Sequence, residues 1–189
     1  MKKNIILAGV GGQGILSIAT VIGEAATKAN LYLKQAEVHG MSQRGGDVQS
    51  NLRLSTEEIY SDLIPQGEAD LIIAMEPMEA LRYVPFLNKD GWVITSSEPF
   101  INIPNYPDEH KIADDLKKLP HVKAMPINDI AKQNHAPRSA NMVLLGMAAD
   151  AIDIVSPNDL REAIGRIFAK KGERVVEDNY KAFDLGLKG

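Results

Sequence analysis

The chain has 189 residues, of which 44% are hydrophobic and 24% are charged, a composition typical of a globular protein with a sizeable core. Its net charge of -4 and the scatter of its 21 Lys and Arg residues argue against nucleic-acid binding. No apolar run approaches the roughly 20 residues of a membrane-spanning helix, so we expect no membrane insertion. The chain contains no cysteine, which excludes disulfides and cysteine-ligated iron–sulfur clusters within it.

The first half of the chain predicts two buried strands, a helix and a hairpin. Residues 4–9 form an apolar run, and glycines end it too early for a signal peptide, so we expect a strand and a cytoplasmic protein. Helical periodicity follows over residues 13–30, and a second apolar run starts at residue 31. Residues 48–54 alternate between apolar and polar, and a turn would fold them back onto a strand at 59–64.

The second half continues the alternation of strands and helices. We expect strands at residues 71–75, 91–95 and 122–125, and helices at 77–87, 111–119, 139–152, from Ser156-Pro157 to Gly172, and at 175–187. Residues 99–107 are rich in proline and form a loop, with or without a short edge strand at 100–103. The pattern predicts one α/β domain over residues 1–189: a three-layer, Rossmann-like fold with a mostly parallel sheet, an inserted β-hairpin and a helical carboxyl-terminal part.

A glycine-rich loop, Gly9-Val10-Gly11-Gly12-Gln13-Gly14, joins the first strand to the first helix. Its spacing fits the dinucleotide-binding fingerprint, and Glu37 stands about 20 residues beyond it, where a ribose-binding acid is expected. However, Glu37 leads into another glycine-bearing segment rather than a helix, and no Lys-Ser or Lys-Thr follows the loop to make a Walker A site. Three interpretations stay open: nucleotide or phosphate binding, close helix–strand packing, and a subunit interface.

A second loop, from His39 to Gly46, contains Gln43-Arg44 before a pair of glycines. A guanidinium on such a backbone suits bidentate contact with a carboxylate or phosphate, and His39 is able to titrate near neutral pH. The alternative interpretation is a β-turn with an exposed arginine.

Three motifs together carry a family resemblance. They are Gly9-Val10-Gly11-Gly12-Gln13-Gly14, Ala36-Glu37-Val38-His39-Gly40-Met41-Ser42-Gln43-Arg44-Gly45-Gly46, and Pro137-Arg138-Ser139-Ala140-Asn141-Met142-Val143-Leu144-Leu145-Gly146. In this order, the motifs resemble the gamma subunit or gamma domain of 2-oxoacid:ferredoxin oxidoreductases, and within that family the small beta subunit of the indolepyruvate branch. The resemblance covers essentially the whole chain, and the middle motif is the distinctive one.

The resemblance implies a subunit of an oxidoreductase complex. Such a complex decarboxylates a 2-oxoacid, here indolepyruvate or another aryl pyruvate, on thiamine diphosphate and Mg, and passes the acyl group to coenzyme A. Electrons leave through iron–sulfur clusters to ferredoxin. The large alpha subunit is expected to carry the thiamine diphosphate, Mg and clusters, so this chain is expected to bind no cofactor alone and to be inactive alone.

We expect the functional residues to lie on these loops, with no catalytic residue and no metal ligand among them. The candidates for an anion, coenzyme A or subunit-interface surface are Gly9, Gly11, Gly12, Gln13, Gly14, Gln43 and Arg44. His39 is either a hydrogen-bonding residue there or a structural one. Arg138, Ser139 and Asn141 begin an apolar helix and either cap it, bond the glycine loop or contact a ligand.

Two further functions compete with this one. The glycine loop and Glu37 fit a stand-alone NAD(P)-dependent oxidoreductase, and the same loop fits a non-catalytic nucleotide- or coenzyme A-binding module. The sequence shows no convincing acid–base pair or nucleophile, which weakens the stand-alone enzyme most.

Overall fold

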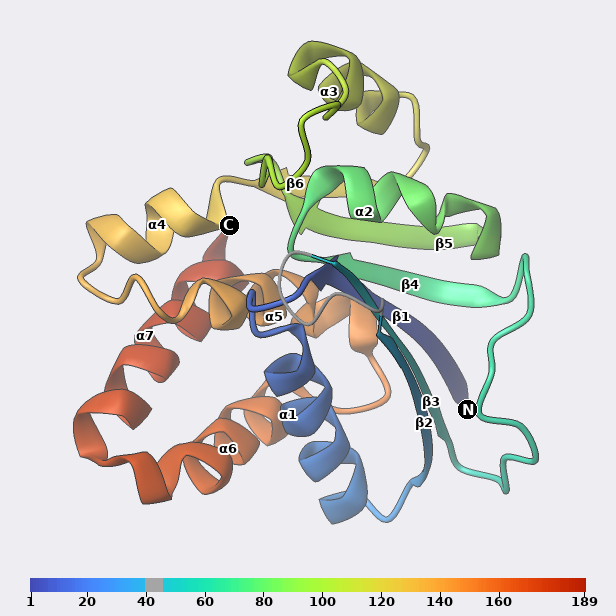
Figure 1. The fold of residues 1–189 in the computed structure, drawn as a ribbon. Coiled ribbons are helices and arrows are strands. Elements are labelled where there is room, and N and C mark those ends of the chain that lie inside the picture. The colour runs from blue at the N-terminus through green and yellow to red at the C-terminus, as the bar shows by residue number, and fades with distance from the viewer. Residues whose placement is uncertain (40–45) are drawn as a thin grey trace.

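The structure is a computed structural model, and it describes residues 1–39 and 46–189. These residues form one six-stranded sheet with the order β2-β3-β1-β4-β5-β6 (Figure 1). The strands are β1 (Lys2–Val10), β2 (Tyr32–His39), β3 (Asp47–Ser55), β4 (Ala69–Ala74), β5 (Leu87–Ser96) and β6 (Val122–Met125). The helices are α1 (Ile15–Lys28), α2 (Pro77–Arg82), α3 (Glu109–Lys117), α4 (Ile127–Gln133), α5 (Ala140–Ile152), α6 (Pro157–Phe168) and α7 (Glu173–Lys188), with short 3-10 turns η1 (Val84–Phe86) and η2 (Ala169–Lys171).

The sheet is mostly parallel, as predicted. β1, β4, β5 and β6 pair with one another in parallel, whereas β3 runs antiparallel to both of its neighbours, β1 and β2. β2 and β3 therefore form an antiparallel pair of neighbouring strands, and residues 40–45 between them lie outside the described ranges.

The predicted return strand at residues 59–64 is wrong. Arg53 on β3 donates to the carbonyl oxygens of Ser61 and Leu63, and Asn51 accepts from the backbone N–H of Ile64. These side-chain bonds hold the segment as a loop, with Ile59 and Ile64 buried. The alternating residues 48–54 do form a strand, within β3, but the segment after them is an irregular one with two buried isoleucines.

Two other local predictions need correction. Residues 100–103 form no strand, because the Phe100 N–H bonds to the Glu76 carboxylate instead of to a neighbouring strand. The helix expected over 77–87 ends at Arg82, and after the turn η1 the chain enters β5 at Leu87.

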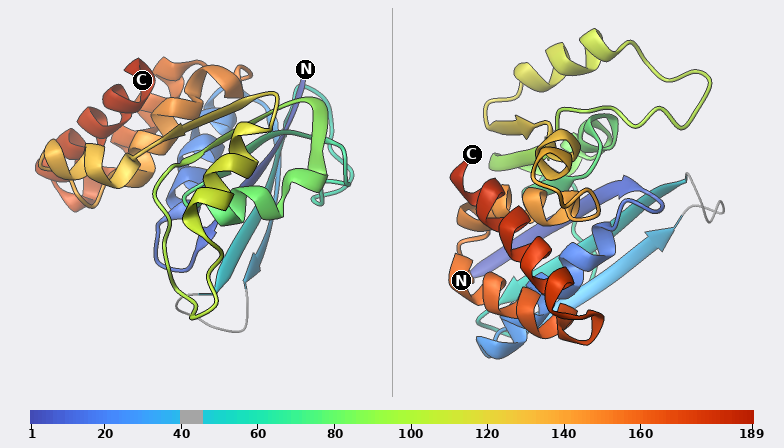
Figure 2. Two further views of the ribbon diagram at one scale, coloured as in Figure 1. Left: turned by 90° about the horizontal axis from the view of Figure 1, so that it is seen from above. Right: turned by 90° about the vertical axis from the view of Figure 1, so that its left-hand side faces the viewer.

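Helices cover both faces of the sheet, which confirms the predicted three-layer architecture (Figures 1 and 2). Alternate residues of β1 point to opposite sides. Ile5 and Leu7 enter the larger core beneath α1, α5, α6 and α7, while Ile6 and Ala8 enter a smaller core beneath α2 and α3.

Glycines allow the helices α5 and α7 to pack closely against each other. A Cβ on Gly186 of α7 would lie 1.9 Å from the carbonyl oxygen of Val143 on α5, and a Cβ on Gly146 would lie 2.1 Å from the carbonyl oxygen of Phe183. The last turns of α7 therefore pack backbone to backbone against the first half of α5.

Candidate functional site

The glycine loop makes a tight turn at the carboxyl end of β1. The Gln13 side-chain oxygen accepts from the backbone N–H of Val10 at 2.7 Å, and Gly12 and Gly14 have φ angles of 101° and 81°. These left-handed conformations strain residues with a Cβ, so the loop depends on glycine there. The N–H of Gly11 donates to the carbonyl oxygen of Gly46 at 2.9 Å, which ties the loop to the end of the second predicted motif.

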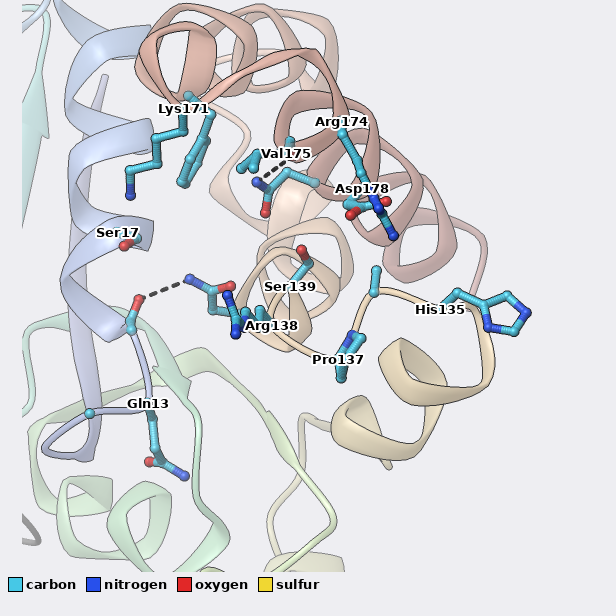
Figure 3. A pocket seen from close by; sticks show the side chains of 16 residues that line it. Gln13, Ser17, His135, Pro137, Arg138, Ser139, Lys171, Arg174, Val175 and Asp178 are labelled. Atoms are coloured by element: carbon cyan, nitrogen blue, oxygen red, sulfur yellow. Dashed lines mark hydrogen bonds between the residues drawn. The ribbon is translucent and has the colours of Figure 1, made fainter.

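Two of the loop's glycines serve close packing. A Cβ on Gly9 would lie 3.0 Å from the Gln13 side-chain oxygen and 3.2 Å from Cβ of Met75. A Cβ on Gly14 would lie 2.9 Å from the side-chain nitrogen of Asn141, which itself donates to the Gly14 carbonyl oxygen at 3.1 Å (Figure 3). The first and third motifs, distant in the sequence, are therefore joined by a direct hydrogen bond.

A cavity of about 600 Å³ lies beside this junction. The first turns of α1, α5 and α7 line it, together with the loop that precedes α5 (Figure 3). Its charged side chains are Arg138, Lys171, Arg174 and Asp178, and Ser17 and Ser139 add hydroxyl groups. Because helix N-termini carry partial positive charge and the cations outnumber the carboxylate, the cavity is suited to an anion.

The predicted site residues divide into three groups. Gly12, Gln13, Gly14, Arg138 and Asn141 line the cavity, as does Ser139. Gly9 and Gly11 belong to the same loop but make its turn and its packing rather than the cavity wall. His39 ends β2 and pairs with Val48, while Gln43 and Arg44 lie outside the described residues.

Lys171 and Arg174 are lining residues that the motifs did not point to. Lys171 belongs to η2, and Arg174 lies in the first turn of α7. One signal was available in the sequence: Lys171 and Arg174 flank Gly172 and Glu173 where a helix begins, and of these residues only the acid suits the helix dipole at that end.

Glu37 does not stand where a dinucleotide fold needs its ribose-binding acid. In such folds the acid ends the strand directly beside the first strand. Here the antiparallel β3 separates β2, which carries Glu37, from β1 and its glycine loop. The amide of Gln35 also donates to the Glu37 carboxylate at 2.7 Å. The topology therefore argues against the NAD(P)-binding interpretation.

Sequence reasoning also missed Glu76, a fully buried carboxylate just after β4. It caps α2 by accepting from the N–H of Glu79 at 2.9 Å, and it accepts from the Phe100 N–H and the Tyr106 hydroxyl. Burial raises the pKa of Glu76, although these hydrogen bonds oppose the shift, and burial together with the Glu76 contact raises the pKa of Tyr106. The acid before Pro77 at a helix start was the signal for this cap.

This carboxylate holds the long loop after β5 against the carboxyl edge of the sheet. Through Phe100 and Tyr106, Glu76 fixes both ends of the segment that carries the exposed side chains of Phe100 and Ile101. Tyr83 also packs in the adjoining core, where burial raises its pKa to about 12. The cluster is thus a structural anchor beside the glycine loop.

In the described ranges, no group of three or more His, Asp and Glu side chains is arranged to hold a metal. The helices found there are all too short or too polar to cross a membrane.

Comparisons with known proteins agree with the motifs. The family model described as pyruvate ferredoxin/flavodoxin oxidoreductase matches residues 4–189. An indolepyruvate oxidoreductase subunit IorB from Archaeoglobus fulgidus is 36% identical, with 98% of this chain and 94% of the relative covered. The subunit of the same name from Pyrococcus horikoshii is also 36% identical, with 100% and 96% covered.

Solved structures share the fold. The gamma subunit of a keto/oxoacid ferredoxin oxidoreductase from Geobacter sulfurreducens has a TM-score of 0.71 at 25% identity, covering 98% of this chain and 96% of that one. A 2-oxoglutarate:ferredoxin oxidoreductase from Magnetococcus marinus, solved with 2-oxoglutarate, coenzyme A and succinyl-CoA, has a TM-score of 0.76 at 26% identity. The match covers 99% of this chain but only 30% of that longer one. The chain belongs to the pyruvate ferredoxin/flavodoxin oxidoreductase family, as a relative of its gamma-type subunits.

Proposed function

We propose that this chain is the small, cluster-free subunit of a thiamine-dependent indolepyruvate or aryl pyruvate:ferredoxin oxidoreductase. The observation that carries the substrate class is the ranking of its relatives. Four indolepyruvate oxidoreductase subunits are 35–36% identical to it along nearly their whole length, whereas 2-oxoglutarate synthase subunits are 27–29% identical.

The proposed reaction uses a 2-oxoacid, coenzyme A and oxidised ferredoxin. The bond between the carboxylate and the carbonyl carbon breaks and releases carbon dioxide, and the acyl carbon is joined to the coenzyme A sulfur. The two electrons left on the acyl carbon reduce two ferredoxins, and the thiol proton is released. In this scheme the large alpha subunit would hold thiamine diphosphate and Mg, which would supply the electron sink for decarboxylation, and iron–sulfur clusters, which would carry the electrons.

Within that complex we assign this chain a binding role as one gamma-type domain. It has no cysteine with which to ligate a cluster. Its glycine loop and the neighbouring loop anchored by Glu76 lie at the carboxyl edge of the sheet, where ligands and partners meet open α/β sheets. Gln43 and Arg44 follow β2, and we propose that they contact coenzyme A or the large subunit.

A purification from the native host tests this function. An affinity-tagged copy of the chain should bring down a larger, cysteine-rich protein with a brown absorbance, and mass spectrometry should identify both chains. The non-catalytic module predicts a different result, namely a chain that binds nucleotide or coenzyme A but never associates with a large subunit. Isolation of an indolepyruvate-oxidising complex without this chain would rule out an essential subunit role.

A further inference from the structure

We infer that the outer edge of β2 pairs with β2 of a second copy of this chain, in an antiparallel, two-fold symmetric register centred on Gln35. The two sheets would then form one continuous sheet across a homodimer. The inference goes beyond the proposed function, because it concerns contacts between copies of the chain and requires no reaction. It rests on residues 32–38, all of which the structure describes.

The two edges of the sheet differ in how well they are protected against further pairing. β2 ends the sheet on one side and β6 on the other (Figure 2). β6 has four residues and lies between Pro120 and Pro126, and short length and proline both hinder an added strand. β2 has eight residues, contains no proline and pairs with β3 without a register shift. Within the described ranges no strand pairs with its outer edge, so this edge is open to one more strand.

One face of β2 also exposes apolar side chains. A Cβ on Gly23 of α1 would lie 3.4 Å from Cδ2 of Leu33, so Leu33 faces α1. Alternation along the strand places Tyr32 and Val38 on the opposite face, where they are 53% and 51% exposed. Among the described residues, the core beneath α2 and α3 on that side of the sheet contains none from β2. An added strand would cover both side chains.

Two-fold symmetry limits the registers that a second copy can adopt. An axis perpendicular to the sheet keeps each face on its own side, so one residue must stand opposite itself and its neighbours pair symmetrically around it. An axis at Lys34 or Glu37 would place two like charges opposite each other, which is unfavourable. An axis at Ala36 would leave Tyr32 opposite a position beyond His39, where β2 ends.

An axis at Gln35 avoids both faults. Tyr32 of each copy then stands opposite Val38 of the other, so the two exposed apolar side chains cover each other twice. An aromatic residue opposite a β-branched one is a favourable cross-strand pair. The remaining pairs place no like charges directly opposite each other: Gln35 with itself, Lys34 with Ala36, and Leu33 with Glu37. The strand is therefore complementary to itself, as an interface between two identical copies must be.

The mass of the full chain in solution tests the pairing. Sedimentation equilibrium between about 1 and 100 μM should show a species of twice the 20.6 kDa monomer mass, and its share should rise with concentration. Tyr32→Lys and Val38→Glu, each alone, should raise the Kd of the dimer about tenfold or more, because each removes both apolar pairs. The double variant sets the two introduced charges opposite each other and should recover much of that affinity. Ile101→Glu, a charge at a 62% exposed apolar side chain on the loop after β5, should leave the Kd within about twofold.

Cross-linking tests the register. The chain contains no cysteine, so an introduced one reports without background. Residues directly opposite each other in an antiparallel pair have Cα atoms about 4.5–5.5 Å apart, within the range of a disulfide. Gln35→Cys should therefore cross-link two copies on mild oxidation faster than Lys34→Cys or Ala36→Cys, whose own copies stand diagonally. Thermal unfolding of each variant verifies its fold.

Three results would overturn the inference: a chain that stays monomeric up to about 100 μM, a dimer that Tyr32→Lys and Val38→Glu leave unchanged, or cross-linking that is fastest at position 34 or 36. A monomer whose β2 amides are protected from hydrogen exchange only when the large subunit is bound would overturn it too, and would identify that subunit as the occupant. None of these results would touch the proposed function, which is measured by association with the large subunit. Conversely, a chain that dimerises through β2 but finds no large subunit would retain this interface and lose that function.

Discussion

A substitution of Gly14 tests most directly the contact between the first and third motifs. Replacing it with alanine introduces two separate penalties. The residue has a φ of 81°, a left-handed conformation that costs a residue with a Cβ about 1–2 kcal/mol. In addition, the new Cβ would lie 2.9 Å from the Asn141 side-chain nitrogen, inside normal contact.

The second penalty has a calculable size. To escape the contact, Asn141 must move and give up its hydrogen bond to the Gly14 carbonyl oxygen, at a cost of about 0.5–1.5 kcal/mol plus any strain of repacking. The two penalties together predict a loss of about 2–4 kcal/mol in the free energy of unfolding. For a chain of this size that corresponds to a fall of about 4–16 °C in Tm.

The assay is urea unfolding followed by circular dichroism, with Gly67→Ala as the matched control. Gly67 has a φ of 76° and nothing within 4 Å of its missing Cβ, so it should show the backbone penalty alone. In an Asn141→Ala background, Gly14→Ala should likewise cost only the backbone penalty. If Gly14→Ala costs the same in both backgrounds, and no more than Gly67→Ala, the contact between the two motifs has no energetic role and the reasoning is refuted.

Other substitutions test the packing of the helices and the buried carboxylate. Gly186→Ala should lose about 3 kcal/mol or more in urea unfolding, because its Cβ meets a backbone carbonyl that no rotamer change relieves; a loss equal to that of Gly67→Ala would contradict this. Tyr106→Phe removes a donor from the buried Glu76 and should cost about 1–3 kcal/mol, whereas Tyr60→Phe at an exposed site should be neutral. Burial raises the Glu76 pKa above its usual 4.5, so the wild type must lose stability as pH rises through that raised value. The free energy of unfolding of Glu76→Gln, measured from pH 4 to 8, should therefore increase relative to that of the wild type as pH rises. A difference between the two proteins that does not change with pH would exclude ionisation of Glu76 as the cause.

The parts of the fold that local chemistry determines were predictable from the sequence. Ser156 and Pro157 predicted the start of α6, and the structure shows a full capping box there, formed by Ser156 and Asp159. The strands β1 and β4 were equally predictable, because a short apolar run between turn-forming residues favours a buried strand. The short helix α4 was missed, since seven residues after Pro126 give too little periodicity to recognise.

The predictions that failed were those that depended on contacts between residues distant in the sequence. The apolar spacing of residues 59–64 looks like a strand, and only the bonds from Arg53 and Asn51 show that it is a loop. Likewise, nothing in the glycine loop indicates that Lys171 will share its cavity. That proximity follows from the backbone contact between α5 and α7, which a linear pattern does not encode. The motifs predicted which loops carry the candidate residues, and the structure adds Lys171 and Arg174 to the lining of the cavity beside them.

Reconstitution of the enzyme tests the central claim most directly. The large subunit encoded by the same host should be purified with and without this chain, and reduction of ferredoxin by indolepyruvate should be followed in the presence of coenzyme A. We predict that each protein alone is inactive and that a mixture restores reduction that depends on indolepyruvate and coenzyme A. Full activity of the large subunit alone, or failure of the two chains to associate, would contradict the account.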